Sequence, residues 1–130
     1  MINIPMIDHI GIRVADADRS LRFYEQFGFK LIANFEVVYI MRTAGGAEIN
    51  LVVNANNTNN DANILMDVDE KYPGITHVAF RIDSMEATVA LIKTAQIPIS
   101  EGPVELGRGQ SVFIRDPDRN TLEFREEWDT

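Results

Sequence analysis

The chain contains the octapeptide Ile7-Asp8-His9-Ile10-Gly11-Ile12-Arg13-Val14, and a similar one, Ile75-Thr76-His77-Val78-Ala79-Phe80-Arg81-Ile82, follows in its second half. Each copy holds one of the chain's two histidines at its third position and an arginine four residues later. Self-similarity at a long spacing is typical of a duplicated structural unit. The sequence therefore predicts two related modules with one histidine at a matching position in each.

Length and composition indicate one domain made of both modules. The chain has 130 residues, of which 45% are hydrophobic. This is enough for one compact core, whereas a unit of about 65 residues is marginal when it folds alone. We therefore expect a single domain with module 1 over residues 1–54, a linker over residues 55–74 and module 2 over residues 75–130.

Charge and cysteine content exclude several classes of function. The 20 acidic and 12 basic residues give a formal net charge of -8, which repels phosphate backbones and anionic lipid surfaces. We expect no nucleic-acid partner and no membrane partner. The chain has no cysteine, so disulfides and thiolate-ligated metals are excluded. Its first residues combine neither a basic start nor a long apolar run, and a cytoplasmic location is expected.

Each half is predicted to contain a strand, a helix and three more strands. Residues 7–14 alternate apolar and polar side chains, which is typical of a half-buried strand. Asp16 or Asp18 can cap a helix that ends near Gly28. Further strands are predicted over residues 29–35, 36–42 and 47–53, with Gly45-Gly46 as a turn.

The second half repeats this order. A strand over residues 75–82 precedes a helix that is capped near Asp83 or Ser84, and Pro98 closes that segment. Strands are then predicted over residues 99–104, 111–115 and 121–125. The connection between the halves has five asparagines between residues 54 and 60 and ends in Lys71-Tyr72-Pro73-Gly74, so a loop is expected there.

Polar side chains gather on one face of the predicted strands, opposite the apolar face. If the polar faces curl inward, a set of possible metal ligands converges: His9, His77, Glu123 and either Glu48 or Asn50. Two neutral imidazoles, a carboxylate and a second oxygen suit a divalent transition metal with positions left open for substrate. A plainer interpretation is that these side chains form the solvated face of an antiparallel sheet. The matched histidines favour the metal site.

Other polar residues and motifs can be interpreted either as structural or as functional. Arg13 and Arg81 lie on the same faces as the histidines and could bind a substrate carboxylate or phosphate. Each arginine could equally well form a salt bridge with a neighbouring carboxylate. Gly107-Arg108-Gly109 is predicted to be a hairpin turn, and Asp116-Pro117-Asp118-Arg119-Asn120 a turn before the last strand.

Several motifs together carry a family resemblance: Asp8-His9-Ile10-Gly11-Ile12-Arg13-Val14-Ala15-Asp16, Phe23-Tyr24, Phe27-Gly28-Phe29, Thr76-His77-Val78-Ala79-Phe80, and Asp116-Pro117-Asp118 before Glu123. Over essentially its whole length the chain resembles the vicinal oxygen chelate superfamily. That family includes glyoxalase I, methylmalonyl-CoA epimerase, extradiol dioxygenases, fosfomycin-resistance enzymes and metal-free bleomycin-binding proteins. The resemblance implies an α+β fold of two tandem βαβββ modules, which form a cupped mixed sheet around a metal, commonly in a homodimer.

The resemblance also implies which residues hold the metal. His9 matches the ligand of the first strand, His77 its counterpart in module 2, and Glu123 the carboxylate of the last strand. The fourth position normally holds glutamate in glyoxalase I. Here it falls on Asn50, and Glu48 is the alternative two residues earlier on the same face. Dioxygenases and fosfomycin enzymes of the family use only two histidines and one glutamate.

Three functions follow from this resemblance, all with a small-molecule substrate or ligand. The first is a glyoxalase-like lyase or isomerase, in which one divalent ion (Ni, Co, Zn, Mn or Fe) chelates vicinal substrate oxygens and stabilises an enediolate. Glu123 or Glu48 would move the proton, and Arg13 or Arg81 would hold a substrate carboxylate. The second is an extradiol ring-cleavage dioxygenase with iron(II) on the two histidines and Glu123. The third is a bleomycin-resistance-like binding protein that sequesters its ligand.

Overall fold

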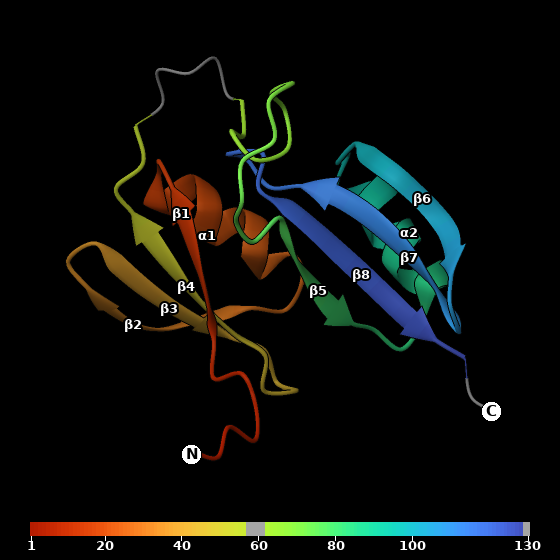
Figure 1. Cartoon of the computed structure of the whole chain (residues 1–130), viewed down its shortest axis with the longest axis horizontal. Helices are drawn as coiled ribbons and strands as arrows, with labels where there is room; N and C mark the ends of the chain where they lie inside the picture. The colour runs from red at the N-terminus through yellow and green to blue at the C-terminus, as the bar shows by residue number, and fades with distance from the viewer. Residues whose placement is uncertain (57–61, 129–130) are drawn as a thin grey trace. The chain divides into compact units, whose positions relative to one another are not determined.

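Figure 1 shows a computed structural model of the chain. The structure describes residues 1–56 and 62–128. The chain divides into two compact units, Met1–Asn60 and Asp61–Thr130. Each unit contains one copy of the histidine octapeptide.

The first module has the order of elements that the sequence predicts. Its elements are β1 (Ile10–Val14), α1 (Ala17–Glu25), β2 (Lys30–Phe35), β3 (Val38–Arg42) and β4 (Glu48–Val53). They form a four-stranded mixed sheet in the order β1-β4-β3-β2. Strand β1 runs parallel to β4, and the other neighbours are antiparallel. Helix α1 packs against β2 and β4 (Figure 1).

Local sequence signals set the ends of α1. Asp16 is its N-cap, because the Asp16 side chain accepts a hydrogen bond from the backbone N–H of Arg19 at 2.8 Å. Gly28 follows the helix with φ 91°, a conformation that glycine adopts without strain. Between these ends, Phe23 and Tyr24 are buried and anchor the helix to the core. Of the two caps that the sequence allows, Asp16 is the one used.

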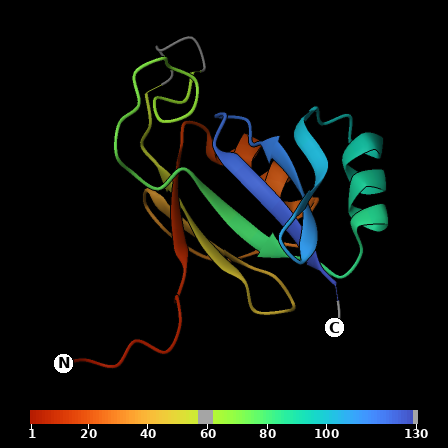
Figure 2. The same cartoon turned by 45° about the vertical axis from the view of Figure 1, so that its right-hand side comes forward.

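The second module repeats the architecture. Its elements are β5 (His77–Arg81), α2 (Met85–Thr94), β6 (Ile99–Leu106), β7 (Gly109–Arg115) and β8 (Thr121–Glu127). The sheet order is β5-β8-β7-β6, and β5 runs parallel to β8. Helix α2 packs against β7 and β8 (Figure 2), and Ser84 is its N-cap. The prediction of an α+β fold with tandem βαβββ modules is confirmed.

Alternation along the strands builds a core on the helix side of each sheet. The buried apolar residues of the sheets include Ile12, Val14, Met41, Ile49, Leu51, Val112, Ile114, Leu122 and Phe124. Residues between them in sequence point to the other face, because neighbouring strand residues alternate sides. The polar side chains that the sequence singles out therefore share the face opposite the helix in each module.

The first and fifth strands begin later than the sequence predicts. Alternation predicts strands from residues 7 and 75, whereas β1 begins at Ile10 and β5 at His77. The pairing partners explain both limits. Strand β8 begins at Thr121 opposite His77, and β4 begins at Glu48, one residue before the partner of Ile10, so residues 7, 8, 75 and 76 lie beyond the strands they would pair with. His9 consequently lies immediately before β1, on exposed chain.

Several predicted connections are confirmed. Gly107-Arg108 joins β6 to β7, and residues 116–120 join β7 to β8. The Asp116 side chain fixes the second turn by accepting hydrogen bonds from the backbone N–H groups of Asp118 and Asn120. Of the predicted asparagine-rich loop, residues 57–60 lie outside the described residues, as do residues 129–130 of module 2. No helix in the described ranges is long and apolar enough to span a bilayer.

Candidate functional site

The second module brings His77 and Glu123 into contact. Parallel pairing places His77 opposite Thr121, and Glu123 lies two residues further along β8 on the same face. His77 Nε2 lies 3.0 Å from Glu123 Oε1, and Glu123 is only 8% exposed. This separation is within hydrogen-bonding distance for an imidazole nitrogen and a carboxylate oxygen. Both atoms are also ligands that divalent transition metals prefer.

The second oxygen of Glu123 is also engaged. Glu123 Oε2 accepts a hydrogen bond of 2.6 Å from Ser111 Oγ. Ser111 Oγ in turn accepts a hydrogen bond of 3.2 Å from Arg125 NH1. A buried carboxylate needs such partners, because an ionised group without them costs several kcal/mol to remove from water. These contacts hold Glu123 in one orientation.

A cavity of about 300 Å³ adjoins His77 in the second module. Its lining includes Phe113, Arg115 and Thr121, and the Phe113 ring meets the His77 ring edge to face with centroids 5.9 Å apart. Thr121 Oγ1 is buried and has no hydrogen-bond partner among the described residues. Because buried polar atoms are normally hydrogen-bonded, this hydroxyl lacks the partner that burial normally requires. The size of the cavity suits a small molecule.

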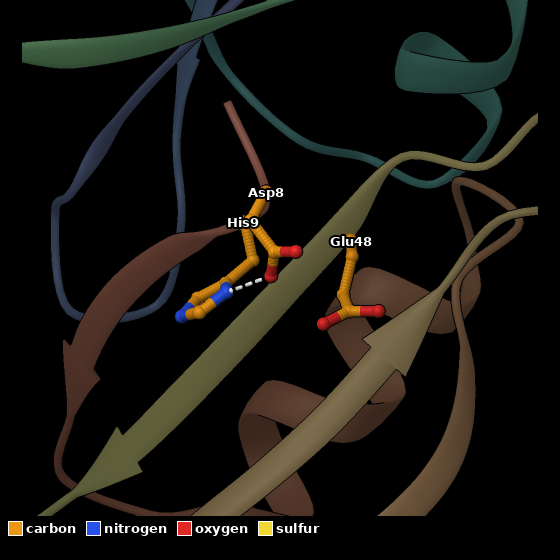
Figure 3. A group of neighbouring side chains, drawn as sticks. All are labelled: Asp8, His9 and Glu48. Atoms are coloured by element: carbon orange, nitrogen blue, oxygen red, sulfur yellow. Dashed lines mark hydrogen bonds and ion pairs between the residues drawn. The ribbon is translucent and has the colours of Figure 1, made fainter. Parts of the chain in front are cut away.

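The first module gathers a different set of ligand atoms around its histidine. Asp8, His9 and Glu48 each offer one ligand atom, and these atoms lie within 4.8 Å of one another (Figure 3). Such a group could hold a metal ion. Glu48 is already bonded to the residue opposite it on β3, because Arg42 NH2 and Nε lie 2.7 and 3.1 Å from Glu48 Oε1. One oxygen of Glu48 is therefore partly neutralised.

Strand register makes Asn50 the structural counterpart of Glu123. Asn50 pairs with Gly11, two residues after His9, just as Glu123 pairs with Ala79, two residues after His77. Asn50 Oδ1 is buried and has no hydrogen-bond partner among the described residues. An amide oxygen in this state lacks the partner that burial normally requires. A bound cation would satisfy it.

In both modules the residue before the histidine bonds to its Nδ1 atom. Asp8 Oδ1 lies 2.6 Å from His9 Nδ1, and Thr76 Oγ1 lies 2.9 Å from His77 Nδ1. A hydrogen bond at one ring nitrogen fixes the orientation of the imidazole and leaves the other nitrogen for a metal. His77 Nε2 faces Glu123, whereas Figure 3 shows that His9 turns Nδ1 toward Asp8 and Nε2 away from Glu48.

An ionic cluster ties the connecting segment to the second module. Asp67 contacts Arg119 Nε at 2.8 Å and Arg115 NH1 at 3.0 Å, and it accepts a hydrogen bond from the backbone N–H of Asn63. The Arg119 guanidinium, together with the Asn63 N–H and Arg115, holds the pKa of Asp67 well below its ordinary value of 3.8, against the opposing effect of burial. Arg115 is therefore fixed beside the cavity.

A comparison with protein families decides the family of this chain. The family model described as the Glyoxalase/Bleomycin resistance protein/Dioxygenase superfamily matches residues 6–124. The chain belongs to this superfamily. The family prediction made from the sequence motifs is therefore confirmed.

Individual relatives of this superfamily agree with that assignment. A probable lactoylglutathione lyase of Vibrio parahaemolyticus is 31% identical over 128 residues, covering 89% of this chain and 86% of the relative. A glyoxalase/dioxygenase from Nostoc punctiforme has a TM-score of 0.78 at 23% identity, covering 98% of this chain and 94% of that one. A fosfomycin resistance protein from Listeria monocytogenes, complexed with Mn(II) and sulfate, has a TM-score of 0.70 at 20% identity and covers 97% and 93%. The two structures show the shared fold.

The donor atoms of this superfamily member fit a divalent metal. The second module offers His77 Nε2 and Glu123 Oε1, and the first offers His9 and the unpartnered Asn50 Oδ1. Nitrogen and oxygen donors of this kind suit Ni, Co, Zn, Mn or Fe, without selecting one of them. The predicted ligands therefore form two half-sets, one in each module.

The two arginines predicted to bind substrate already have side-chain partners. Arg13 Nε donates to Asn54 Oδ1 at 2.9 Å, and Arg81 NH2 lies 3.0 Å from Glu127 Oε1. Both arginines are exposed. Arg81 thus pairs with a carboxylate, which is the structural use that the sequence left open, whereas the partner of Arg13 is an amide.

Some residues that contact or adjoin the second half-set were not predicted from the sequence, among them Ser111, Arg115, Thr121 and Thr76. Thr121 shares the face of Glu123 by simple alternation, so a search for every polar residue on that face finds it. Ser111 and Arg115 alternate with Val112 and Ile114 on β7, but their proximity to Glu123 depends on the register between β7 and β8. No pattern within one strand reveals that register.

Proposed function

We propose that this chain is a divalent-metal-dependent lyase or isomerase of the glyoxalase type that acts on a small oxygenated substrate. The observation that carries the proposal is the contact between His77 Nε2 and the buried Glu123 Oε1 beside a cavity. A buried carboxylate in contact with an imidazole offers a metal two ligand atoms, and the carboxylate can also accept a proton from a substrate. Similarity to a probable lactoylglutathione lyase supports the choice of reaction.

The metal would take its ligands from both modules of the fold. We propose His9, His77 and Glu123 as three ligands and Asn50 as the fourth, with Glu48 as the alternative for that position. Register equivalence with Glu123 and the unpartnered Oδ1 support Asn50, whereas the bond to Arg42 counts against Glu48. A homodimer, common in this superfamily, is part of the same proposal.

The residues of the chain would divide the chemistry between them. A bound divalent metal supplies Lewis acidity where negative charge develops on the substrate oxygens. Glu123 Oε1 would take a proton from the substrate carbon and return it to the neighbouring carbon, as general base and then general acid. Glu48 is the alternative base through its second oxygen. Thr121 Oγ1 would bind a substrate oxygen in the cavity, and Arg13 or Arg81 would remain candidates for a substrate carboxylate.

A second candidate is an extradiol-type dioxygenase. Asn50 favours it, because a neutral amide at the fourth position leaves two histidines and one carboxylate as the strong ligands. That set corresponds to the facial triad of iron(II) oxygenases. The edge of Phe113 beside His77 would border an aromatic substrate.

The test is reconstitution followed by assay. The chain, purified without oxygen and stripped of metal, is loaded in turn with nickel, cobalt, zinc, manganese and iron(II) and mixed with methylglyoxal and glutathione. We expect metal-dependent formation of lactoylglutathione, read from its thioester absorbance, and its loss in Glu123→Gln. Ring cleavage of a catechol by the iron(II) form alone would establish the second candidate. Failure to bind any of the five metals would contradict both and indicate a ligand-sequestering protein.

A further inference from the structure

The structure assigns a role to a serine that lies outside the proposed ligand set. We infer that Ser111, supported by Arg125, is the positioning residue that fixes the Glu123 carboxylate for metal binding. The inference rests on the proposed function, because it concerns how one of the proposed ligands is held. It identifies the side chains of module 2 that orient the Glu123 carboxylate.

The direction of the hydrogen bonds follows from the chemistry of the groups. An arginine guanidinium can only donate, so Ser111 Oγ must accept the bond from Arg125 NH1. The single hydroxyl proton of Ser111 is then directed to Glu123 Oε2, 2.6 Å away. Glu123 Oε2 is therefore occupied, and Oε1 is the oxygen that faces His77 Nε2 at 3.0 Å. The serine selects which carboxylate oxygen is presented.

The surroundings of Ser111 leave its hydroxyl little freedom. Ser111 is completely buried. Gly102 of β6 lies so close that a Cβ atom on it would be 2.5 Å from the Ser111 carbonyl oxygen, and its φ of 92° also favours glycine. Strand β6 therefore packs directly against this part of β7. A buried hydroxyl between a fixed donor and a fixed acceptor is held in one rotamer.

Arg125 is itself fixed, so its charge stays beside the pair. Arg125 NH2 donates to the Leu106 carbonyl oxygen at 2.7 Å, and Arg125 Nε donates to Glu127 Oε2 at 3.2 Å. A guanidinium anchored at all three nitrogens polarises the Ser111 hydroxyl toward Glu123. Glu123 thereby gains a charge-assisted network although it is more than nine-tenths buried.

The first module lacks this network at the equivalent positions. In module 2, Ser111 pairs with Arg125 and Phe113 pairs with Glu123. In module 1, the corresponding pairs are Val38 with Val52 and Ile40 with Asn50. Two valines thus replace the serine and the arginine, and the Asn50 Oδ1 atom is left without a partner among the described residues. The hydrogen bonds that hold Glu123 therefore come from side chains of module 2 and not from the backbone that the two modules share.

The test compares metal binding by two variants that make the same substitution. Metal-free chain is titrated with Co²⁺, whose visible absorption reports binding. Ser111→Ala is expected to weaken Co²⁺ binding about 10-fold, because partners that orient a metal ligand typically contribute 10- to 100-fold. Ser20→Ala is the matched control: Ser20 is also completely buried but lies on α1, so its variant is expected to bind within about twofold of the wild type.

A double-mutant cycle separates positioning from general damage to the fold. If Ser111 acts through the carboxylate, Ser111→Ala has no further effect in a Glu123→Gln background. Arg125→Lys, which keeps Ser111, is a second variant with a smaller expected loss of about threefold, should Ser111→Ala not fold. An unchanged affinity in Ser111→Ala, or an equal loss in the Glu123→Gln background, would overturn this inference and leave the proposed function standing. A wild-type chain that fails to bind Co²⁺ would overturn both.

Discussion

The two modules share one backbone but use it for different polar groups. Matching registers equate Asn50 with Glu123 and Glu48 with Thr121. Of these two equivalent positions, module 1 has its carboxylate at the first, Glu48, and module 2 has its carboxylate at the second, Glu123. In module 1 the carboxylate is bonded to an arginine, whereas in module 2 it contacts the histidine. Duplication reproduced the scaffold and the histidine, and the neighbouring side chains made the half-sets unequal.

An arginine at one equivalent position illustrates how such a difference arises. Arg42 of β3 pairs directly with Glu48, and the two form a salt bridge. Its counterpart Arg115 of β7 pairs with Thr121, which offers no charge, and Arg115 instead contacts Asp67 of the connecting segment. Module 2 thus has a hydroxyl where module 1 has a carboxylate, and Thr121 Oγ1 has no hydrogen-bond partner among the described residues.

The largest expected effect compares the strongest ligand of each half-set. Glu123→Gln removes the charge but keeps the shape of the side chain. It is expected to weaken Co²⁺ binding at least about 100-fold, since even residues that only hydrogen-bond to a metal ligand contribute 10- to 100-fold. Asn50→Ala, which removes a neutral ligand, is expected to cost about 10-fold. Calorimetric titration of the two variants measures both. Equal losses of Co²⁺ affinity in the two variants would contradict the proposal that the modules contribute unequally to metal binding.

The next effect concerns stability and is confined to module 2. Asp67→Asn is expected to lower the free energy of unfolding by about 2 kcal/mol at pH 7, because it removes charged hydrogen bonds to Arg115 and Arg119. The folded-state pKa of Asp67 is lowered, so its contribution is complete above the ordinary value of 3.8 and is lost as the pH falls through the folded-state pKa.

Urea unfolding of wild type and Asp67→Asn at several pH values measures this contribution. The difference between the two is expected to shrink once the pH falls below about 4. Asp8→Asn is the matched control in module 1, where the carboxylate is 88% exposed and its pairing with His9 contributes at most about 1 kcal/mol. A difference for Asp67→Asn that stayed constant down to pH 2 would show that the carboxylate charge is not the cause.

The order of elements could be predicted from the sequence because it depends on local patterns. The repeated octapeptide, the period-2 strands and the caps at Asp16 and Ser84 are all visible within short windows. The predicted start of β1 was three residues too early, because the observed start depends on where β4 begins. A strand limit is a property of the pair, and one segment does not contain it.

The candidate site was predictable only in part, for the same reason. Alternation correctly assigns Glu123 and His77 to one face, and the structure shows their contact. The bond between Ser111 and Glu123 joins diagonal neighbours on adjacent strands, which become visible only when the register is known. The contacts of Asp67 with Arg115 and Arg119 connect residues about 50 positions apart, with no sequence pattern to relate them.

A smaller effect decides the fourth ligand. Asn50→Ala is expected to weaken Co²⁺ binding about 10-fold, whereas Glu48→Ala is expected to change it less than about threefold, because Glu48 Oε1 is already engaged by Arg42. Electron paramagnetic resonance of the Co²⁺ form checks whether the coordination changes in each variant. A large loss in Glu48→Ala with a silent Asn50→Ala would exchange the two assignments.

The smallest expected effect tests whether the hydrogen bond from Ser111 to Glu123 can be reproduced in module 1. Asn50→Glu places a glutamate in module 1 at the position equivalent to Glu123, but without a hydroxyl at the position equivalent to Ser111. Adding Val38→Ser supplies a hydroxyl at the position equivalent to Ser111. In a double-mutant cycle of unfolding free energies, the two substitutions are expected to couple favourably by about 1 kcal/mol, the usual contribution of one hydrogen bond. Strictly additive effects would show that register equivalence is not enough.

The most direct test of the account is the number of metal ions bound per chain. Protein purified without oxygen or chelators is analysed by elemental mass spectrometry, and the metal-free form is titrated with Co²⁺. If the two unequal half-sets serve one site, the result is one ion per chain, and either His9→Ala or His77→Ala reduces the affinity for that single ion. Two ions per chain, each lost with one histidine alone, or no ion at all, would contradict the account.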